Sequence, residues 1–345
     1  MLGWFFKNAR DLPWRRTRDP YAIWVSEIML QQTQVKTVMP YWERWMRELP
    51  TIESAAKAPS AKIHKLWEGL GYYTRVRNLQ NAALVIVEKY GGKFPEHFDE
   101  VLALPGIGHY TAGAICSIAF NQPTAILDGN VIRGLTRIFG IGENPKEKQT
   151  NARLWQLAGE LVQDSKGNCS HLNQSLMELG ALICTPRNPQ CLICPVKRLC
   201  VAFKENRVAE LPKLGEKEKA TARTFFAFVI ERNGKILVRQ RPEKIVNAHL
   251  WEFPNVERNG DDLSAEEMFK SHFAFAPASL IPLCTIKHSI TRYRITLEAF
   301  QVCLKKSPKK LAGIWASPKE FDSIAFSSAH KKLASAAVKS MLSGR

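Results

Sequence analysis

Four cysteines stand close together in the chain: Cys184, Cys191, Cys194 and Cys200, with six, two and five residues between them. Thiolates packed this closely hold a metal centre, and four of them suit a 4Fe–4S cluster. A zinc site is the alternative, because Cys191 and Cys194 form one Cys-x-x-Cys pair, but zinc ribbons usually show two such pairs. We therefore predict an iron–sulfur cluster, with a structural role because no flavin or nicotinamide fingerprint accompanies it.

Two carboxylates stand out because of their neighbours. Glu27 is the only ionisable residue of the apolar stretch 22–30, and Ile23 and Trp24 lie one helical turn before it. An apolar wall raises the pKa of a carboxyl group and keeps its proton available for donation. Asp128 precedes a helix start. From the residues alone, an exposed edge position for the first and an N-cap worth roughly 1 kcal/mol for the second remain equally good interpretations.

A glycine-rich turn, Leu104-Pro105-Gly106-Ile107-Gly108, joins two predicted short helices. Glycines at alternate positions let the backbone turn tightly and leave amide N–H groups free at the start of the next helix. That arrangement binds anions and would suit a DNA phosphate. A purely structural turn would have the same sequence, so the motif by itself leaves both open.

The overall charge indicates the kind of partner. The chain has 345 residues, a formal net charge of +17 and a pI near 9.6. Such an excess of Lys and Arg points to a polyanion, most simply nucleic acid, although a basic solvated surface is the alternative. The four other cysteines are scattered, which suits a reducing compartment. With no apolar run of roughly 20 residues and no signal-peptide layout, we expect a cytoplasmic, nucleoid-associated protein with no membrane contact.

The periodicity of apolar residues predicts two domains and a linker. Residues 1–203 are predicted to be helical, residues 204–222 form a charged linker, and residues 223–345 form a small α+β domain. The helices predicted for the first domain lie near 21–30, 35–45, 60–68, 75–90, 97–103, 109–119, 129–139, 151–164 and 171–183. In the second domain, strands are predicted at 224–230, 235–240 and 292–304, and helices near 264–272 and 328–342.

Several of these motifs occur together in one family. Residues 104–115, residues 127–131 and the cysteine loop resemble the helix-hairpin-helix DNA glycosylase superfamily. Residues 24–35 and 69–73 are similar to the adenine DNA glycosylases, the MutY family, which remove adenine mispaired with 8-oxoguanine or guanine. The resemblance covers nearly the whole chain. It implies a mainly α helix-hairpin-helix glycosylase domain with a 4Fe–4S cluster loop, followed by a C-terminal α+β Nudix-like domain.

The resemblance also implies roles for the carboxylates. Cleavage of an N-glycosidic bond requires a protonated leaving base and a negative charge near the oxocarbenium-like sugar. Glu27 would protonate adenine N7 and later handle the water, and Asp128 would face the sugar. Tyr110 and Asn130 would position Asp128 or the sugar. Tyr110 stands where strand-nicking relatives carry a nucleophilic lysine, so the enzyme is expected to be monofunctional.

Other residues match DNA-contacting positions of the family. Gln32 and Tyr72 match the wedge that fills the space left by a flipped base, although core packing is the alternative for the tyrosine. The resemblance further implies DNA binding by Gly106, Gly108 and Arg15, and a base pocket formed by Trp14, Leu30, Val35 and Glu178. The expected partner is double-stranded DNA with an A:8-oxoG or A:G mispair, bound by a monomer.

The C-terminal part departs from the family pattern. Residues 223–345 resemble the Nudix-like domain with which this family senses 8-oxoguanine, and His288, Thr291 and Arg292 are the candidate lesion-recognition residues. Family members carry Phe-Ser-His where this chain has Ile290-Thr291-Arg292, so we expect a weaker preference for 8-oxoguanine over guanine. The helix that would hold Mg²⁺ in a Nudix hydrolase lacks its acidic motif here, which predicts no pyrophosphatase activity.

Two other functions fit part of these features. An endonuclease III-like lyase for oxidised pyrimidines would share the cluster and the hairpin, but Tyr110 and the extra domain argue against it. A non-catalytic iron–sulfur DNA-binding protein would need neither Glu27 nor Asp128, because binding alone requires no carboxylate facing DNA.

Overall fold

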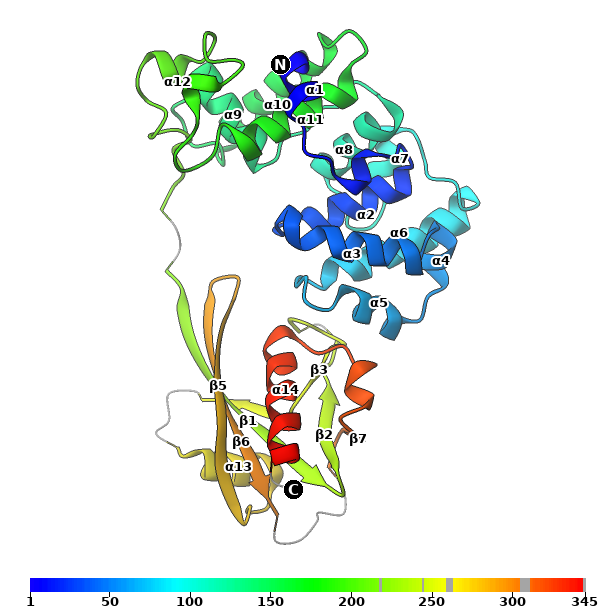
Figure 1. Ribbon diagram of the computed structural model, residues 1–345, viewed down its shortest axis with the longest axis vertical. Helices are drawn as coiled ribbons and strands as arrows, with labels where there is room; N and C mark the ends of the chain where they lie inside the picture. Colours follow the sequence, from blue (N-terminus) through cyan, green and yellow to red (C-terminus); the bar gives the residue numbers. More distant parts are fainter. Residues whose placement is uncertain (217–218, 244, 259–262, 305–310, 344–345) are drawn as a thin grey trace. The chain divides into compact units, whose positions relative to one another are not determined.

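The computed structural model describes residues 1–216, 219–243, 245–258, 263–304 and 311–343. The chain divides into two compact units (Figure 1). The helical unit consists of Met1–Ala58 and Arg77–Glu216, and the sheet unit consists of Pro59–Val76 and Lys217–Arg345. This grouping differs from the sequence-based division because it places residues 59–76 with the C-terminal part.

The helical unit is built almost entirely from short helices. They are α1 (Leu2–Asn8), η1 (Pro13–Arg15), α2 (Pro20–Leu30), α3 (Val35–Glu48), α4 (Ile52–Lys57), most of α6 (Thr74–Tyr90), α7 (Phe98–Leu102), α8 (His109–Phe120), α9 (Gly129–Phe139), α10 (Lys148–Gln163), α11 (Cys169–Leu182), η2 (Cys191–Ile193) and α12 (Val201–Lys204). The predicted helices are present, with ends that differ by a few residues. No helix in the described residues is long and apolar enough to cross a lipid bilayer.

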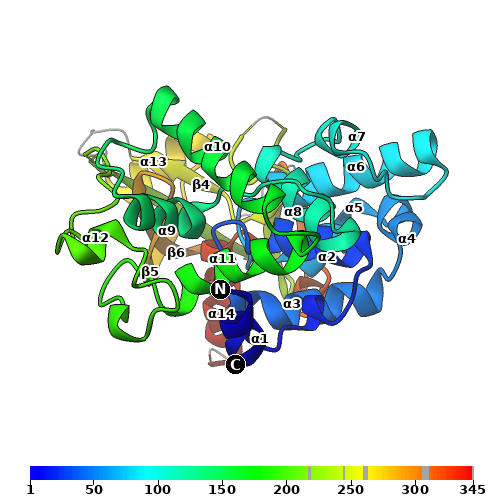
Figure 2. The same ribbon diagram turned by 90° about the horizontal axis from the view of Figure 1, so that it is seen from above.

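Four of these helices share one core, which positions the candidate site. Ile23 of α2, Ala114 of α8, Val131 of α9 and Leu176 of α11 belong to a single buried cluster. Figure 2 shows α2, α8 and α11 side by side, in agreement with their contacts. Because each helix is fixed by this core, side chains at their facing ends are held in a constant arrangement.

The glycine-rich turn lies between α7 and α8. Gly106 has φ +74°, and a Cβ atom there would lie 2.5 Å from Cβ of Asn78 on α6. Both the left-handed backbone and the close approach therefore require glycine at this position. Gly108 is the N-cap of α8, so the turn delivers the chain directly into the helix that carries Tyr110.

The sheet unit contains a mixed seven-stranded sheet and two flanking helices. Its elements are α5 (Ser60–Trp67), β1 (Thr221–Arg232), β2 (Lys235–Gln240), β3 (Trp251–Glu252), β4 (Asn255–Glu257), α13 (Ala265–Phe273), β5 (Ser279–Ile290), β6 (Tyr293–Cys303), β7 (Ile314–Ala316), η3 (Glu320–Asp322) and α14 (Ser328–Ser343). The strand order is β3-β2-β1-β6-β5, with β4 paired to β1 and β7 to β2. Strands β1 and β6 are parallel, and the other pairings are antiparallel.

Alternation along β1 explains why both faces of the sheet are covered. Val229 packs in one cluster with Leu333 of α14, whereas Phe228 packs in another with Phe269 of α13. Successive strand residues point to opposite faces, so an apolar run such as 226–230 requires a layer on each side. The two helices provide these layers (Figure 1).

Residues 59–76 are joined to the C-terminal part by a buried carboxylate. Glu68 is 5% exposed and accepts hydrogen bonds from the backbone N–H of Phe326, at 2.9 Å, and from Nζ of Lys331, at 2.5 Å. Lys65 on α5 also donates to the carbonyl of Ile324 at 3.0 Å. These bonds explain why this segment belongs to the sheet unit.

Candidate active site

One cavity of about 540 Å³ in the helical unit collects all the predicted catalytic and base-pocket residues. Elements η1, α2, α8 and α11 and the start of α9 contribute to its wall. The predicted residues that line it are Trp14, Arg15, Glu27, Leu30, Gln32, Val35, Tyr110, Asp128, Asn130 and Glu178. The structure therefore brings together residues that are up to 164 positions apart in the sequence, because Trp14 and Glu178 share this wall.

Glu27 lies at the cavity wall with little access to solvent. Its exposed fraction is 5%, and its Oε2 accepts a hydrogen bond from the Tyr110 hydroxyl at 2.8 Å. Burial raises the pKa of Glu27 to about 7, even though the hydrogen bond from Tyr110 acts to lower it. A large fraction of this carboxyl group is therefore protonated near neutral pH, as the apolar neighbours in the sequence predict.

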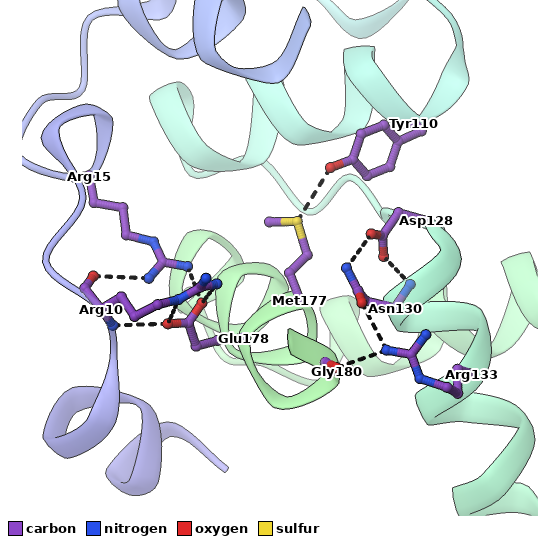
Figure 3. A network of polar contacts seen from close by, with 9 residues as sticks. All are labelled: Arg10, Arg15, Tyr110, Asp128, Asn130, Arg133, Met177, Glu178 and Gly180. Atoms are coloured by element: carbon purple, nitrogen blue, oxygen red, sulfur yellow. Dashed lines mark hydrogen bonds and ion pairs between the residues drawn. The ribbon is translucent and has the colours of Figure 1, made fainter. Parts of the chain in front are cut away.

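Asp128 is held in one orientation by the start of α9 (Figure 3). Its Oδ1 accepts from the backbone N–H groups of Asn130 and Val131, at 3.1 and 2.8 Å, and its Oδ2 accepts from Nδ2 of Asn130 at 2.9 Å. The predicted N-cap is formed. The same contacts fix the carboxylate at the cavity, so the capping role is compatible with the predicted role at the site.

Asn130 is itself fixed by α11 and by an arginine. Nη2 of Arg133 donates to Oδ1 of Asn130 at 2.8 Å and to the carbonyl of Gly180 at 2.7 Å (Figure 3). A Cβ atom at Gly180 would lie 2.6 Å from Cβ of Asn130, so the helix backbone approaches the site closely. Asn130 therefore acts as a fixed link between Asp128 and the core.

Three residues of α11 that line the cavity, Gln174, Met177 and Ala181, were not predicted from the sequence. The Met177 sulfur lies 3.3 Å from the Tyr110 hydroxyl (Figure 3). Gln174 stands four residues before Glu178 and therefore on the same face of the helix. That spacing is the signal in the sequence that could have found it.

The four cysteines surround a second, apolar cavity. It is lined by Cys184, Cys191, Cys194 and Cys200 together with side chains such as Leu179. Burial raises the pKa of the last three thiols, and the neighbouring thiols raise it further. Nη1 of Arg137 lies 3.4 Å from Sγ of Cys184. Four converging sulfurs with a cation nearby fit an iron–sulfur cluster, whose thiolate ligands are anionic.

The two wedge candidates share an uncommon backbone conformation. Gln32 has φ 55° and is exposed, and Tyr72 has φ 46° and is 44% exposed. Positive φ in a residue other than glycine is costly and is concentrated at functional sites. Arg75 supports the turn of Tyr72 by donating to the carbonyls of Leu70 and Gly71 at 2.9 and 3.1 Å. Gln32 lies in the helical unit and Tyr72 in the sheet unit.

The lesion-recognition candidates lie at the tip of the β5–β6 hairpin. His288 and Thr291 line a cavity of about 730 Å³ in the sheet unit, and Arg292 lies beside it, with Nη2 3.3 Å from the Tyr293 hydroxyl. Thr291 has φ 50°, and its hydroxyl donates to the carbonyl of Ile290 at 2.7 Å. The hydroxyl therefore already has an intramolecular partner.

Comparison with protein-family models first defines the class. Residues 25–160 match the HhH-GPD superfamily of base excision DNA repair proteins, residues 184–200 match the iron–sulfur binding domain of endonuclease III, and residues 226–336 match the NUDIX domain. The fold and the site are thus those of a helix-hairpin-helix DNA glycosylase with a 4Fe–4S cluster and a C-terminal Nudix domain. The iron–sulfur match spans all four cysteines and decides against the zinc alternative.

Comparison with individual proteins then identifies the family. The mouse protein "Adenine DNA glycosylase" is 34% identical over 96% of this chain and 76% of its own length, and the human protein of that name is 34% identical over 96% and 72%. A solved thermostable thymine-DNA glycosylase is 34% identical, with a TM-score of 0.54 over 59% of this chain and 93% of that one. The chain belongs to the adenine DNA glycosylase family and excises adenine in base excision repair.

Proposed function

We propose that this enzyme removes adenine paired with 8-oxoguanine or guanine in duplex DNA, acting as a monomer and leaving an abasic site. The observation that carries this proposal is the pair of unlike carboxyl groups at one cavity. Glu27 is buried with a pKa raised to about 7, whereas Asp128 accepts three hydrogen bonds at a helix start. Glu27 can donate a proton, and Asp128 presents a second carboxyl group that is held in place by its hydrogen bonds.

The chemistry assigns one role to each carboxyl group. An adenine anion is a poor leaving group, so Glu27 protonates N7 and the neutral base departs. The sugar becomes oxocarbenium-like, and the fixed carboxylate of Asp128 stabilises its positive charge. Adenine inside a duplex is inaccessible, so it must be flipped into the cavity at a cost of a few kcal/mol. Gln32 and Tyr72 are proposed to fill the space that it leaves.

The absence of strand cleavage is inferred from Tyr110. Its phenol cannot form the imine through which a lyase breaks the DNA backbone. Among the described residues that line the cavity, there is no lysine. Hydrolysis by a water molecule is then the route that remains for the sugar, with Glu27, deprotonated after donation, as the base that accepts the proton of the water.

Recognition of the opposite base is proposed to involve His288, Thr291 and Arg292. Ile290, Thr291 and Arg292 stand where related enzymes carry Phe-Ser-His, and the Thr291 hydroxyl donates a hydrogen bond to the carbonyl of Ile290. We therefore expect A:8-oxoG to be preferred over A:G by a smaller factor than in relatives that carry Phe-Ser-His.

A location in the cytoplasm at the nucleoid follows from the substrate and would be tested by cell fractionation.

The test is a panel of duplexes holding A:8-oxoG, A:G, G:T or thymine glycol, each incubated with and without alkali. The G:T duplex is included because a solved relative is a thymine-DNA glycosylase. Cleavage of the adenine strand only after alkali supports the proposal. Alkali-independent nicking, or a faster reaction at G:T or thymine glycol, would contradict it. Sedimentation with and without duplex measures whether the active species is a monomer.

A further inference from the structure

One carboxylate, Glu178, and two guanidinium groups, Arg10 and Arg15, form a cluster in the wall of the catalytic cavity (Figure 3). Glu178 on α11 has no exposed surface, and its oxygens accept from the backbone N–H of Arg10 at 2.9 Å, from Nε and Nη2 of Arg10 at 2.8 and 2.7 Å, and from Nη2 of Arg15 at 2.8 Å. Burial alone would raise the pKa of Glu178, but these hydrogen bonds lower it to about 2. The carboxylate is charged at any pH at which the enzyme works.

The cluster holds a segment that has little regular structure of its own. Residues 9–19 connect α1 to α2 and contain only the short helix η1. Within this segment, Nη1 of Arg15 donates to the carbonyl of Arg10 at 3.1 Å. Glu178 therefore binds the segment at its beginning, through Arg10, and near its middle, through Arg15.

This segment carries one wall of the base cavity. Trp14 is 6% exposed, lines the cavity, and packs edge-on against Trp42 of α3 with ring centroids 6.0 Å apart. The residue next to Trp14 is Arg15, which is bonded to Glu178. A shift of the segment would therefore move the indole that faces the proposed base.

The cluster also acts electrostatically on Glu27. The groups that face Glu27 are Tyr110 from α8, Asp128 from the start of α9 and Arg15 from η1. The positive charge of Arg15 acts to lower the pKa of Glu27, and the charge of Asp128 acts to raise it. Glu178 is the carboxylate that compensates Arg15.

We propose that Glu178 is a positioning residue for adenine excision, acting through Arg10 and Arg15 to hold Trp14 in place and to balance the charge beside Glu27. It does not contact the base, because its oxygens already accept four hydrogen bonds. This inference rests on the proposed placement of adenine in the cavity. The sequence predicted Glu178 as a residue of the base pocket, and the proposal gives it a positioning role in place of a contact with the base. The proposal also explains why Arg15 points into the protein.

The central test compares Glu178→Gln with the wild-type holoenzyme on an A:G duplex. The variant keeps the side-chain volume and removes the charge. We expect the single-turnover rate constant to fall roughly ten- to a hundredfold, because small misplacements in an active site have effects of this size. Affinity for the duplex should change by less than about threefold. The basic limb of the pH–rate profile should move to lower pH, because the uncompensated charge of Arg15 favours the carboxylate form of Glu27.

Two further variants separate positioning from a purely structural role. In the double variant Glu178→Gln/Arg15→Gln, the basic limb should return toward its wild-type position, and in Arg15→Gln alone it should move to higher pH. Asp11→Asn is the matched control, since it removes an exposed ion pair with Arg16 in the same segment and should leave rate and profile unchanged. Circular dichroism and cluster absorbance show whether Glu178→Gln folds. If it does not, the basic limb of the pH–rate profile of Arg15→Gln still tests the proposal, because it should move to higher pH.

The outcomes are distinguishable. A wild-type rate in Glu178→Gln overturns the proposal. A slower reaction with unchanged pH limbs in all variants also overturns it, because the cluster would then only support the fold. If instead the wild-type enzyme itself prefers a base other than adenine, that result contradicts the proposed function. It does not contradict the positioning role of Glu178.

Discussion

Two buried glutamates, one in each unit, show how environment decides the charge of the same side chain. Glu27 in the helical unit is 5% exposed, and Glu252 in the sheet unit is 3% exposed. Glu27 accepts from a neutral phenol, whereas Glu252 accepts from Nε of Arg239 at 3.0 Å and forms an ion pair with Arg241. Burial raises the pKa of Glu27 to about 7. At Glu252 the positive charges outweigh burial and lower the pKa.

The difference teaches that burial alone does not mark a catalytic acid. A buried carboxyl group beside a neutral donor keeps its proton and can give it away. One between two guanidinium groups is fixed as an anion and contributes to the fold. The proton of Glu27 is thus available for chemistry, whereas the negative charge of Glu252 is held by Arg239 and Arg241.

The largest expected effect is on Glu27. Glu27→Gln keeps the shape but cannot donate a proton to adenine, so the single-turnover rate of excision should fall by about 10²–10⁴. Quenched reactions on an A:8-oxoG duplex measure this rate. The matched control is Glu252→Gln, which should stay within a few-fold of wild type. Excision by Glu27→Gln at nearly the wild-type rate would remove the contrast between the two residues.

The second-largest effect on the rate of excision is expected for a substitution of Asp128. Asp128→Asn should slow excision by about 10²–10³, because the charge that stabilises the sugar is lost. Asparagine caps a helix about as well as aspartate, so thermal stability should change little. The rate and the melting temperature of the same preparation separate the two roles. A large loss of stability without a loss of rate would leave only the capping role.

The sequence predicted the local features well. The capped start of α9, the helix that carries Glu27 and the cysteine loop all depend on neighbours within a few positions. Such short-range patterns are visible in the residues themselves. For the same reason, strands β1 and β2 were predicted at 224–230 and 235–240, two β-rich runs that are close together in the sequence.

The remaining features depend on contacts between distant residues. Glu178 meets Arg10 across 168 positions, and Glu68 meets Phe326 across 258, and no local pattern reveals either pair. Strand β5 was not predicted over residues 279–290, because Pro282 and a register shift interrupt its alternation. Strands β3, β4 and β7 have only two or three residues, which is too short for a period to be recognised.

The pH dependence of stability should have opposite signs for the two glutamates. The folded pKa of Glu27, about 7, lies above its ordinary value of 4.5, so the protein loses stability as the pH rises between these values. The loss amounts to about 3 kcal/mol. Glu27→Gln removes it and should therefore gain stability relative to wild type from pH 5 to pH 8. Urea titrations at both pH values measure the difference, and a constant difference would show that Glu27 is ionised in the folded enzyme.

The smallest expected effect is on Glu252. Glu252→Gln leaves two guanidinium groups without their anion, and we expect a loss of about 2 kcal/mol in the sheet unit at neutral pH. The pKa of Glu252 is lower in the folded protein than in the unfolded chain. Its contribution to the free energy of unfolding is therefore present above the pKa of the unfolded chain and is lost as the pH falls. The difference in stability between Glu252→Gln and wild type should accordingly become smaller in acid.

Hydrogen exchange in β2 and β3 would localise this loss to the sheet unit. Glu257→Gln is its control, since the Arg223 pair that it breaks is more exposed and should contribute less than about 1 kcal/mol. If Glu252→Gln were instead more stable than wild type at neutral pH, Glu252 would resemble Glu27. The protonation of both residues would then follow from burial alone, and the arginines would not account for the difference between them.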